Sequence, residues 1–327
     1  MGGGSWGTAL ALVLARARRK HEISLWVRDP ELAKSIEQSR ENPRYLPGHP
    51  LDPSAKVTSN IQRAIYGAQI LIGAIPTAHA RIVYAAAAPG VTGAIFVSAA
   101  KGLEPDTHKR MSEVASEVFE KTSGLKVAVL SGPSFAAEVA RGEPTAVVLA
   151  SRDVTLAREL QEEFAAPNFR VYSNTDVLGV ELAGAMKNVI AIAAGVCQGL
   201  GLGSNPLAAL ITRGLAEMSR FAAALGAQPD TLAGLAGLGD LVLTCTGALS
   251  RNRQVGIELG KGRALDEILA GLRRVAEGVG TTSALLALAG EAKVELPVTE
   301  QVAAILHAGK SPRDAIRDIM ERPQRPE

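Results

Sequence analysis

The first half of the chain alternates short runs rich in β-branched residues with segments of helical periodicity. This pattern predicts strands at residues 22–27, 69–75, 94–98, 126–130, 145–150 and 169–172. It predicts helices at 8–14, 30–40, 77–88, 108–121 and 153–165. Such alternation is typical of a parallel sheet covered by helices. We therefore expect an α/β domain over residues 1–174.

Strand patterns disappear after about residue 174. Asn174 or Thr175 can cap a long helix that runs through Lys187 to about Gly199, and helical patterns recur at 207–225 and 281–293. The length of 327 residues is sufficient for about two domains. Residues 175–327 are therefore expected to form an all-helical second domain.

Three glycines near the start of the chain carry a nucleotide-binding signal. Gly2, Gly4 and Gly7 satisfy the pattern G-x-G-x-x-G, and a helix is predicted directly after them. In this motif the backbone approaches a pyrophosphate closely at the helix N-terminus. The motif is weak by itself, because any glycine-rich start would give the same letters. Together with the strand at 22–27, it predicts a Rossmann-like, dinucleotide-binding domain.

The strand at 22–27 ends in Arg28 and Asp29. In dinucleotide-binding domains, the residue at this strand end meets the adenosine ribose of the cofactor. An acidic residue there favours NAD, whereas arginine favours the 2′-phosphate of NADP. We expect NADPH to be accepted, and the sequence leaves open whether NADH or NADPH is preferred. The alternative for Arg28 is an ordinary exposed charge.

The strand that should precede the glycine motif is missing, since Met1 stands directly before Gly2. In the doubly wound order this strand is central and pairs with a neighbour on each side. The expectation is that natural translation begins about half a dozen residues upstream, with an apolar strand. Restoring such a segment should raise the melting temperature and tighten cofactor binding.

Two lysines lie where they can do chemistry. Lys101 follows the strand at 94–98, at the carboxyl end where open α/β sheets bind ligands. Lys187 lies within an apolar helical segment, and burial lowers a lysine pKa towards the range of a general acid or base. The alternative for each lysine is an exposed residue whose aliphatic part covers apolar surface.

The segment from Gly237 to Gly256 concentrates polar groups within apolar sequence. Ser250, Arg251, Asn252 and Arg253 offer donors suited to a small anion such as phosphate. The alternative is a solvated loop before a helix. Asp240 stands among apolar residues, and a buried carboxylate needs a partner, for which a lysine elsewhere is the candidate.

Composition and charge exclude several classes of protein. The 35 basic and 33 acidic residues leave a net charge of +2, so no nucleic-acid partner is indicated. The two cysteines are far apart in the sequence, and the five histidines are scattered without the spacing of metal ligands. No metal site is therefore expected. The charges near residue 15 follow the apolar run rather than precede it, which argues against an export signal. No uninterrupted membrane span occurs, and a cytoplasmic location follows.

The chemistry-bearing residues match one family in uninterrupted order from Gly2 to about Pro297. The matching segments are Gly4–Ala11, Lys101-Gly102, Leu130–Ala136, Gly142–Ala146 and Lys187-Asn188. Together they resemble bacterial NAD(P)-dependent glycerol-3-phosphate dehydrogenase. The resemblance implies reversible reduction of dihydroxyacetone phosphate to sn-glycerol 3-phosphate, the precursor of the phospholipid backbone.

The resemblance also implies roles for individual residues. Lys187 would accept or donate the proton, with Lys101 and Asp240 as the other catalytic residues. The positions that match the family's substrate site are Lys101, Gly132, Ser134, Lys187, Asp240, Ser250, Arg251 and Asn252. The expected cofactor-binding residues are Gly2, Gly4, Ser5, Trp6, Gly7, Arg28, Tyr45, Lys101, Ala136, Arg251, Val275 and Glu277. The number of subunits stays open, with a homodimer as one option.

Two other functions remain as alternatives at this point. A related two-domain hydroxyacid dehydrogenase would act on another small phosphorylated or acidic substrate, but it has no need of the cluster at 250–253. A non-catalytic nucleotide sensor would bind the cofactor without turnover, but it has no need of Lys101, Lys187 and Asp240 together.

Overall fold

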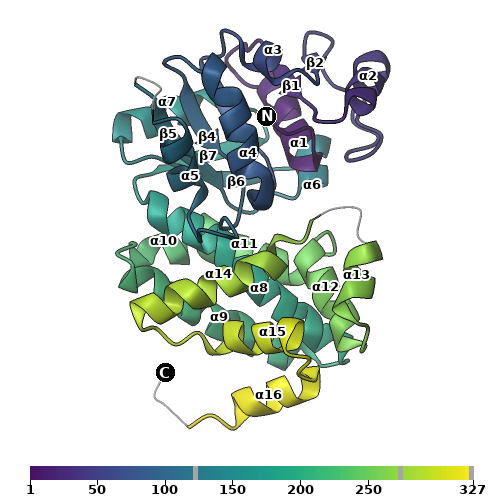
Figure 1. Ribbon diagram of the computed structural model, residues 1–327, viewed down its shortest axis with the longest axis vertical. Coiled ribbons are helices and arrows are strands. Elements are labelled where there is room, and N and C mark those ends of the chain that lie inside the picture. Colours follow the sequence, from purple (N-terminus) through teal and green to yellow (C-terminus); the bar gives the residue numbers. More distant parts are fainter. Residues whose placement is uncertain (121–123, 272–274, 324–327) are drawn as a thin grey trace. The chain divides into compact units, whose positions relative to one another are not determined.

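The computed structural model describes residues 1–120, 124–271 and 275–323 (Figure 1). Contacts between Cα atoms divide the chain into two compact units. The first unit comprises Met1–Lys101 and Lys109–Glu181, and the second comprises Gly102–His108 and Leu182–Glu327. The predicted boundary after residue 174 stays a prediction.

The first unit contains two sheets. A five-stranded sheet has the order β3-β4-β5-β6-β7, with the bounds β3 (Ile70–Gly73), β4 (Ile95–Ser98), β5 (Lys126–Ser131), β6 (Thr145–Ala150) and β7 (Phe169–Asn174). A two-stranded parallel sheet pairs β1 (Ser24–Trp26) with β2 (Lys56–Thr58). The predicted α/β domain is confirmed, although β2 was not among the predicted strands.

One strand pair departs from the predicted parallel sheet. Strands β5 and β6 are antiparallel, whereas the other pairs in both sheets are parallel. The connection between them contains only the six-residue helix α6 (Ala136–Arg141). Six helical residues rise about 9 Å, but six strand residues rise about 20 Å. The chain does not return to the beginning of β5 along this short helix, and β6 runs in the opposite direction to β5.

Helices cover both faces of the five-stranded sheet, as Figure 1 shows. Neighbouring side chains of a strand point to opposite faces, so Val97 packs in one apolar core and Phe96 in the other. The Val97 core receives α1 (Ser5–Ala15), α2 (Pro30–Ser39), α6 and α7 (Val154–Glu163). The Phe96 core receives α3 (Ile61–Ile65), α4 (Thr77–Ala87) and α5 (Met111–Val118), with the short η1 (Ala88–Gly90) beside α4.

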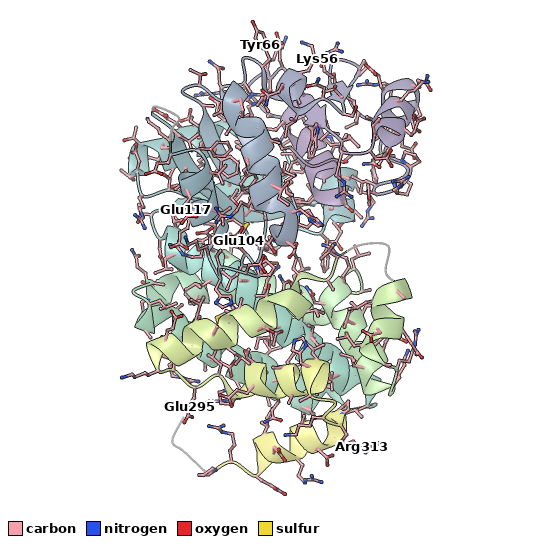
Figure 2. All side chains as sticks on the ribbon, viewed as in Figure 1. Lys56, Tyr66, Glu104, Glu117, Glu295 and Arg313 are labelled. Carbon is pink, nitrogen blue, oxygen red and sulfur yellow. The ribbon has the colours of Figure 1, made fainter. Side chains whose placement is uncertain are left out.

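The outer edge of this unit is formed by the β2–α3 segment. Figure 2 shows the side chains of Lys56, at the start of β2, and Tyr66, after α3, directed away from the core. Tyr66 is 90% exposed, and the exposed Lys56 pairs with the exposed Glu22 at 3.4 Å. These side chains therefore belong to the solvated surface of the unit.

Met1 and Gly2 lie between the two sheets. The Met1 amino group donates to the Ile72 carbonyl at 2.7 Å, and the Ala74 amide donates to the Met1 carbonyl at 2.9 Å. On the other side, the Gly2 amide donates to the Trp26 carbonyl at 3.2 Å. These two residues thus take the place that the predicted first strand would occupy, between β1 and β3.

The second unit is helical, as predicted. Its elements are α8 (Val177–Gly199), most of which lies in this unit, α9 (Ser204–Ala224), α10 (Pro229–Ala233), the short π-helix η2 (Leu235–Gly239), α11 (Asp240–Thr246), α12 (Arg251–Gly260), α13 (Leu265–Gly271), α14 (Glu277–Ala292), α15 (Pro297–His307) and α16 (Pro312–Met320). Helix α8 is long and apolar enough to cross a membrane, but 89% of its most apolar window is buried inside the protein. It is therefore placed as a core helix.

Candidate active site

The glycine loop before α1 leaves room for a ligand at one position and none at the others. Gly2 has a φ of +109°, and a Cβ on Gly7 would lie 1.9 Å from the Gly2 carbonyl oxygen. A Cβ on Gly4 would meet no atom within 4 Å, and Gly4 caps α1 without any side-chain bond. The first amides of a helix have no partner within it, so this end of α1 is suited to a pyrophosphate.

Trp6, in the first turn of α1, provides a second sign of a ligand. Its indole Nε1 is buried and has no hydrogen-bond partner among the described residues. Leaving a buried donor unpaired costs about 1 to 3 kcal/mol. This donor and the open space at Gly4 fit a dinucleotide bound along the N-terminus of α1, beside the predicted residue Ser5.

Asn42 ties the loop that carries Tyr45 to the glycine loop. The Asn42 side chain is fully buried and donates to Gly3 O and Thr8 Oγ1, both at 2.9 Å. It also accepts the Tyr45 amide at 3.1 Å. The structure therefore places Tyr45 next to the glycine loop, although the sequence analysis did not identify Asn42. The Asn42-Pro43 pair marks a turn, which was the only local signal.

Lys101 lies at the carboxyl ends of the neighbouring strands β4 and β5. Its Nζ donates to Gly132 O at 2.7 Å and to Ser134 Oγ at 3.2 Å. Ser134 Oγ in turn donates to Gly132 O at 2.8 Å. The structure thus brings together three residues that were predicted to bind the substrate, and Ala136 begins α6 directly beyond them.

Lys187 and Asp240 form a buried ion pair. Lys187, on α8, is 5% exposed, and its Nζ lies 2.5 Å from Asp240 Oδ1. Asp240 is 1% exposed at the start of α11. One helical turn later, Thr244 Oγ1 accepts a hydrogen bond from Lys187 Nζ at 3.0 Å. The predicted contact between Asp240 and a distant lysine is confirmed, and Thr244 is an addition that the sequence analysis missed.

The N-terminus of α12 carries the predicted anion cluster. Ser250 caps the helix, and its Oγ accepts a backbone amide of the first turn at 3.2 Å. Asn252 is buried, donates to Asn188 Oδ1 at 2.8 Å and accepts the Gly278 amide at 3.0 Å. Arg251 is exposed in the same turn. The cluster is therefore the first turn of a helix, and not the irregular loop that was its alternative.

Close contact between helix backbones fixes this turn relative to Lys187. A Cβ on Gly195 of α8 would lie 2.0 Å from Arg253 O, and a Cβ on Gly256 of α12 would lie 2.0 Å from Ile192 O. Only glycine permits this approach, since backbone oxygens cannot move aside as flexible side chains do. The positions of the anion cluster and of Lys187 are thus set by one helix pair.

The remaining predicted residues lie at the surface. Arg28 is exposed beyond the end of β1, and Val275 is 45% exposed two residues before the half-buried Glu277, which begins α14. Lys101 belongs to the first unit, whereas Lys187 and Asp240 belong to the second.

The two cysteines are buried as protonated thiols. Both cysteines, Cys197 and Cys245, are buried, and burial raises the pKa of the Cys245 thiol to about 12, so that it stays protonated. Among the described residues, no group of three or more His, Cys, Asp or Glu side chains is placed to hold a metal.

Comparison with known proteins assigns the chain to a family. Residues 1–157 match the NAD-dependent glycerol-3-phosphate dehydrogenase N-terminus, and residues 176–317 match the C-terminus of the same family. A glycerol-3-phosphate dehydrogenase (NAD(P)+) from Koribacter versatilis is 53% identical over 325 residues, which are 99% of this chain and 96% of the relative. Another from Nitratidesulfovibrio vulgaris is 52% identical over 330 residues, or 100% and 98% of the two chains.

Solved structures agree with this assignment. The crystal structure of glycerol-3-phosphate dehydrogenase from Coxiella burnetii has a TM-score of 0.92 and 40% identity, covering 98% of this chain and 97% of the other. The yeast enzyme of that name has a TM-score of 0.82 and 26% identity, with 98% of each chain covered. The chain therefore belongs to the NAD-dependent glycerol-3-phosphate dehydrogenase family.

Proposed function

We propose that the protein interconverts dihydroxyacetone phosphate and sn-glycerol 3-phosphate, with NAD(P)H as the hydride donor, and supplies glycerol phosphate for phospholipid synthesis. The observation that carries this proposal is the buried Lys187–Asp240 pair, since it holds a proton donor where water is excluded. Residues 1–174 would bind the cofactor, and residues 175–327 would supply the catalytic lysine. The location would be the cytoplasm.

The residues around Lys187 provide for proton transfer. A nicotinamide cofactor, when bound, would supply the hydride for reduction of the ketone carbon. Lys187 donates a proton from Nζ to the oxygen of the developing alkoxide, and in the reverse direction it accepts that proton. Asp240 and Thr244 hold Nζ in place at 2.5 and 3.0 Å. Lys101 would contribute a positive charge of the kind that stabilises an alkoxide oxygen.

The first turn of α12 would bind the phosphate of the substrate. Its backbone amides, the Arg251 fork and the Asn252 amide are donors of the kind that phosphate oxygens require. Asn252 donates a hydrogen bond to Asn188, the neighbour of Lys187. This bond fixes the phosphate site relative to the proton donor. Binding energy from the phosphate thus orients a ketone carbon that lies away from it.

Cofactor oxidation tests the proposed function. Absorbance of NADH or NADPH is followed with dihydroxyacetone phosphate, and unphosphorylated dihydroxyacetone serves as the control. We expect turnover with the phosphorylated ketone and far slower turnover with the control. Equal rates for the two ketones would remove the phosphate site from the proposal. Cofactor binding without turnover would instead favour a nucleotide sensor.

Arg251→Lys is expected to raise the Michaelis constant for dihydroxyacetone phosphate about tenfold, with little change in kcat. Lysine keeps the positive charge but loses the paired, planar donors that match phosphate oxygens. Arg263→Lys is the matched control, since Arg263 lies just beyond the same helix and pairs with Glu258 at 2.9 Å. If the two variants have the same steady-state kinetics, the α12 cluster is an ordinary solvated turn.

A further inference from the structure

A second arginine lies at the end of β1. The Arg44 guanidinium Nη1 is 2.8 Å from Asp29 Oδ2, with exposed side-chain fractions of 54% and 38%. Arg28 directly precedes Asp29 in the chain. One arginine therefore adjoins Asp29 in sequence and another contacts its carboxylate, at the strand end where dinucleotide-binding domains meet the adenosine ribose.

The Asp29 carboxylate is occupied by contacts within the protein. Its Oδ1 accepts the amides of Glu31 and Leu32 at 3.0 and 3.2 Å, which caps α2, while Oδ2 contacts Arg44. The Leu32 amide and then the Arg44 guanidinium lower the pKa of this carboxyl. In NAD-selective sites an acidic residue here accepts hydrogen bonds from the ribose hydroxyls. Asp29 instead caps a helix and pairs with a cation.

The position of Arg44 is set by the glycine loop. Arg44 lies two residues after Asn42, whose buried side chain is bonded to Gly3 and Thr8. Asn42 also accepts the Tyr45 amide, so the backbone on both sides of Arg44 is fixed. The turn that carries Arg44 is thereby anchored to the loop that would hold the cofactor pyrophosphate.

We propose that Arg44 is a second determinant of cofactor choice and binds the 2′-phosphate of NADPH together with Arg28. This inference rests on the proposed function, with NADPH as a cofactor, and on the prediction from the sequence that Arg28 meets the 2′-phosphate. With NADPH, the Arg44 fork would bind the more highly charged phosphate in place of the Asp29 carboxylate. With NADH, Arg44 would stay on Asp29. Arg44 therefore contributes to the binding free energy of NADPH and not to that of NADH.

Equilibrium binding to the full chain tests this inference without turnover. Dissociation constants for NADPH and NADH are measured by calorimetry for the parent, Arg44→Ala and Arg28→Ala. We expect Arg44→Ala to raise the dissociation constant of NADPH about tenfold and to leave that of NADH within a factor of about two of the parent value. Lys34→Ala, which removes an exposed cation from α2, is the matched control and should change neither constant.

The parent separates failure of the proposed function from failure of the inference, since a parent that binds neither cofactor contradicts the function, whereas the variants test the arginines alone. Arg28→Ala should also raise the dissociation constant of NADPH more than that of NADH. An equal effect on both cofactors, or none on either, would mean that Arg28 does not discriminate between them. If Arg44→Ala changes the two constants equally, or changes neither, Arg44 does not contact the 2′-phosphate. Asp29→Asn keeps an oxygen that accepts the first amides of α2 but loses the negative charge that holds Arg44. This variant should therefore lower the dissociation constant of NADPH. Weaker NADPH binding by Asp29→Asn would also overturn the inference.

Discussion

Replacement of Lys187 by alanine is expected to lower kcat by about 10²- to 10⁴-fold while the affinity for NADH and NADPH stays nearly unchanged. General acid–base groups contribute rate factors of this size, and the lost charge near the alkoxide adds to the effect. Stopped-flow reduction of dihydroxyacetone phosphate gives the rate, and fluorescence titration gives the cofactor affinity. Turnover within about tenfold of the parent would remove Lys187 from the mechanism.

A structural effect of this substitution must be separated from a chemical one. Loss of the ammonium group leaves Asp240 buried without its cation, which destabilises proteins by about 3 to 5 kcal/mol. Lys187→Gln is the companion variant, because its amide can still donate to Asp240 and Thr244 but cannot act as an acid. Lys187→Gln should be destabilised less than Lys187→Ala and should still lose the rate. Added methylamine should restore part of the activity of Lys187→Ala, since the small cation can enter the space left by the side chain.

The buried amino group of Met1 is expected to make stability fall as the pH falls from about 8 to about 5. Burial lowers the pKa of this group from 8.0 to about 5. Within that interval the unfolded chain binds a proton that the folded chain does not bind. The contribution of this group to the free energy of unfolding therefore falls by about 1.4 kcal/mol for each pH unit, or about 4 kcal/mol in total, and is largest above pH 8.

Denaturant unfolding at pH 5.5, 7 and 8.5 measures this dependence. The comparison is a chain with several β-branched residues placed before Met1, which turns the amine into a peptide group. Such a segment can pair with β1 and β3, so it should remove most of the pH slope, raise the melting temperature and tighten cofactor binding. The same slope and melting temperature for both chains would show that the Met1 amine is not the cause.

Strands of the first unit were predictable from sequence because their apolar runs are buried in the sheet. The predicted strand at 145–150 coincides with β6, and the others agree to within a few residues. Strand β2 was missed because it has only three residues, of which Val57 alone is buried. So short a segment shows no alternation of apolar and polar residues. The antiparallel direction of β6 depends on how β5 and β6 are connected, which residue patterns within the strand do not express.

The site was predictable where a polar residue interrupts an apolar pattern. Asp240 and Lys187 both stand out in this way, and the structure pairs them. Thr244 does not stand out, since threonine is common in buried helices and its role depends on the partner on α8. Arg44 is an exposed residue in a turn, and its contact with Asp29 becomes visible only when the chain is folded.

The division of the second unit into two separate stretches of chain has a consequence for synthesis. Residues Gly102–His108 belong to it, and Leu103 among them is 1% exposed. These residues leave the ribosome before Leu182, so the helical unit cannot be completed until both stretches have emerged. A fragment that begins at residue 175 lacks Gly102–His108 and with them the buried Leu103. The two halves are therefore best recovered from one continuous polypeptide.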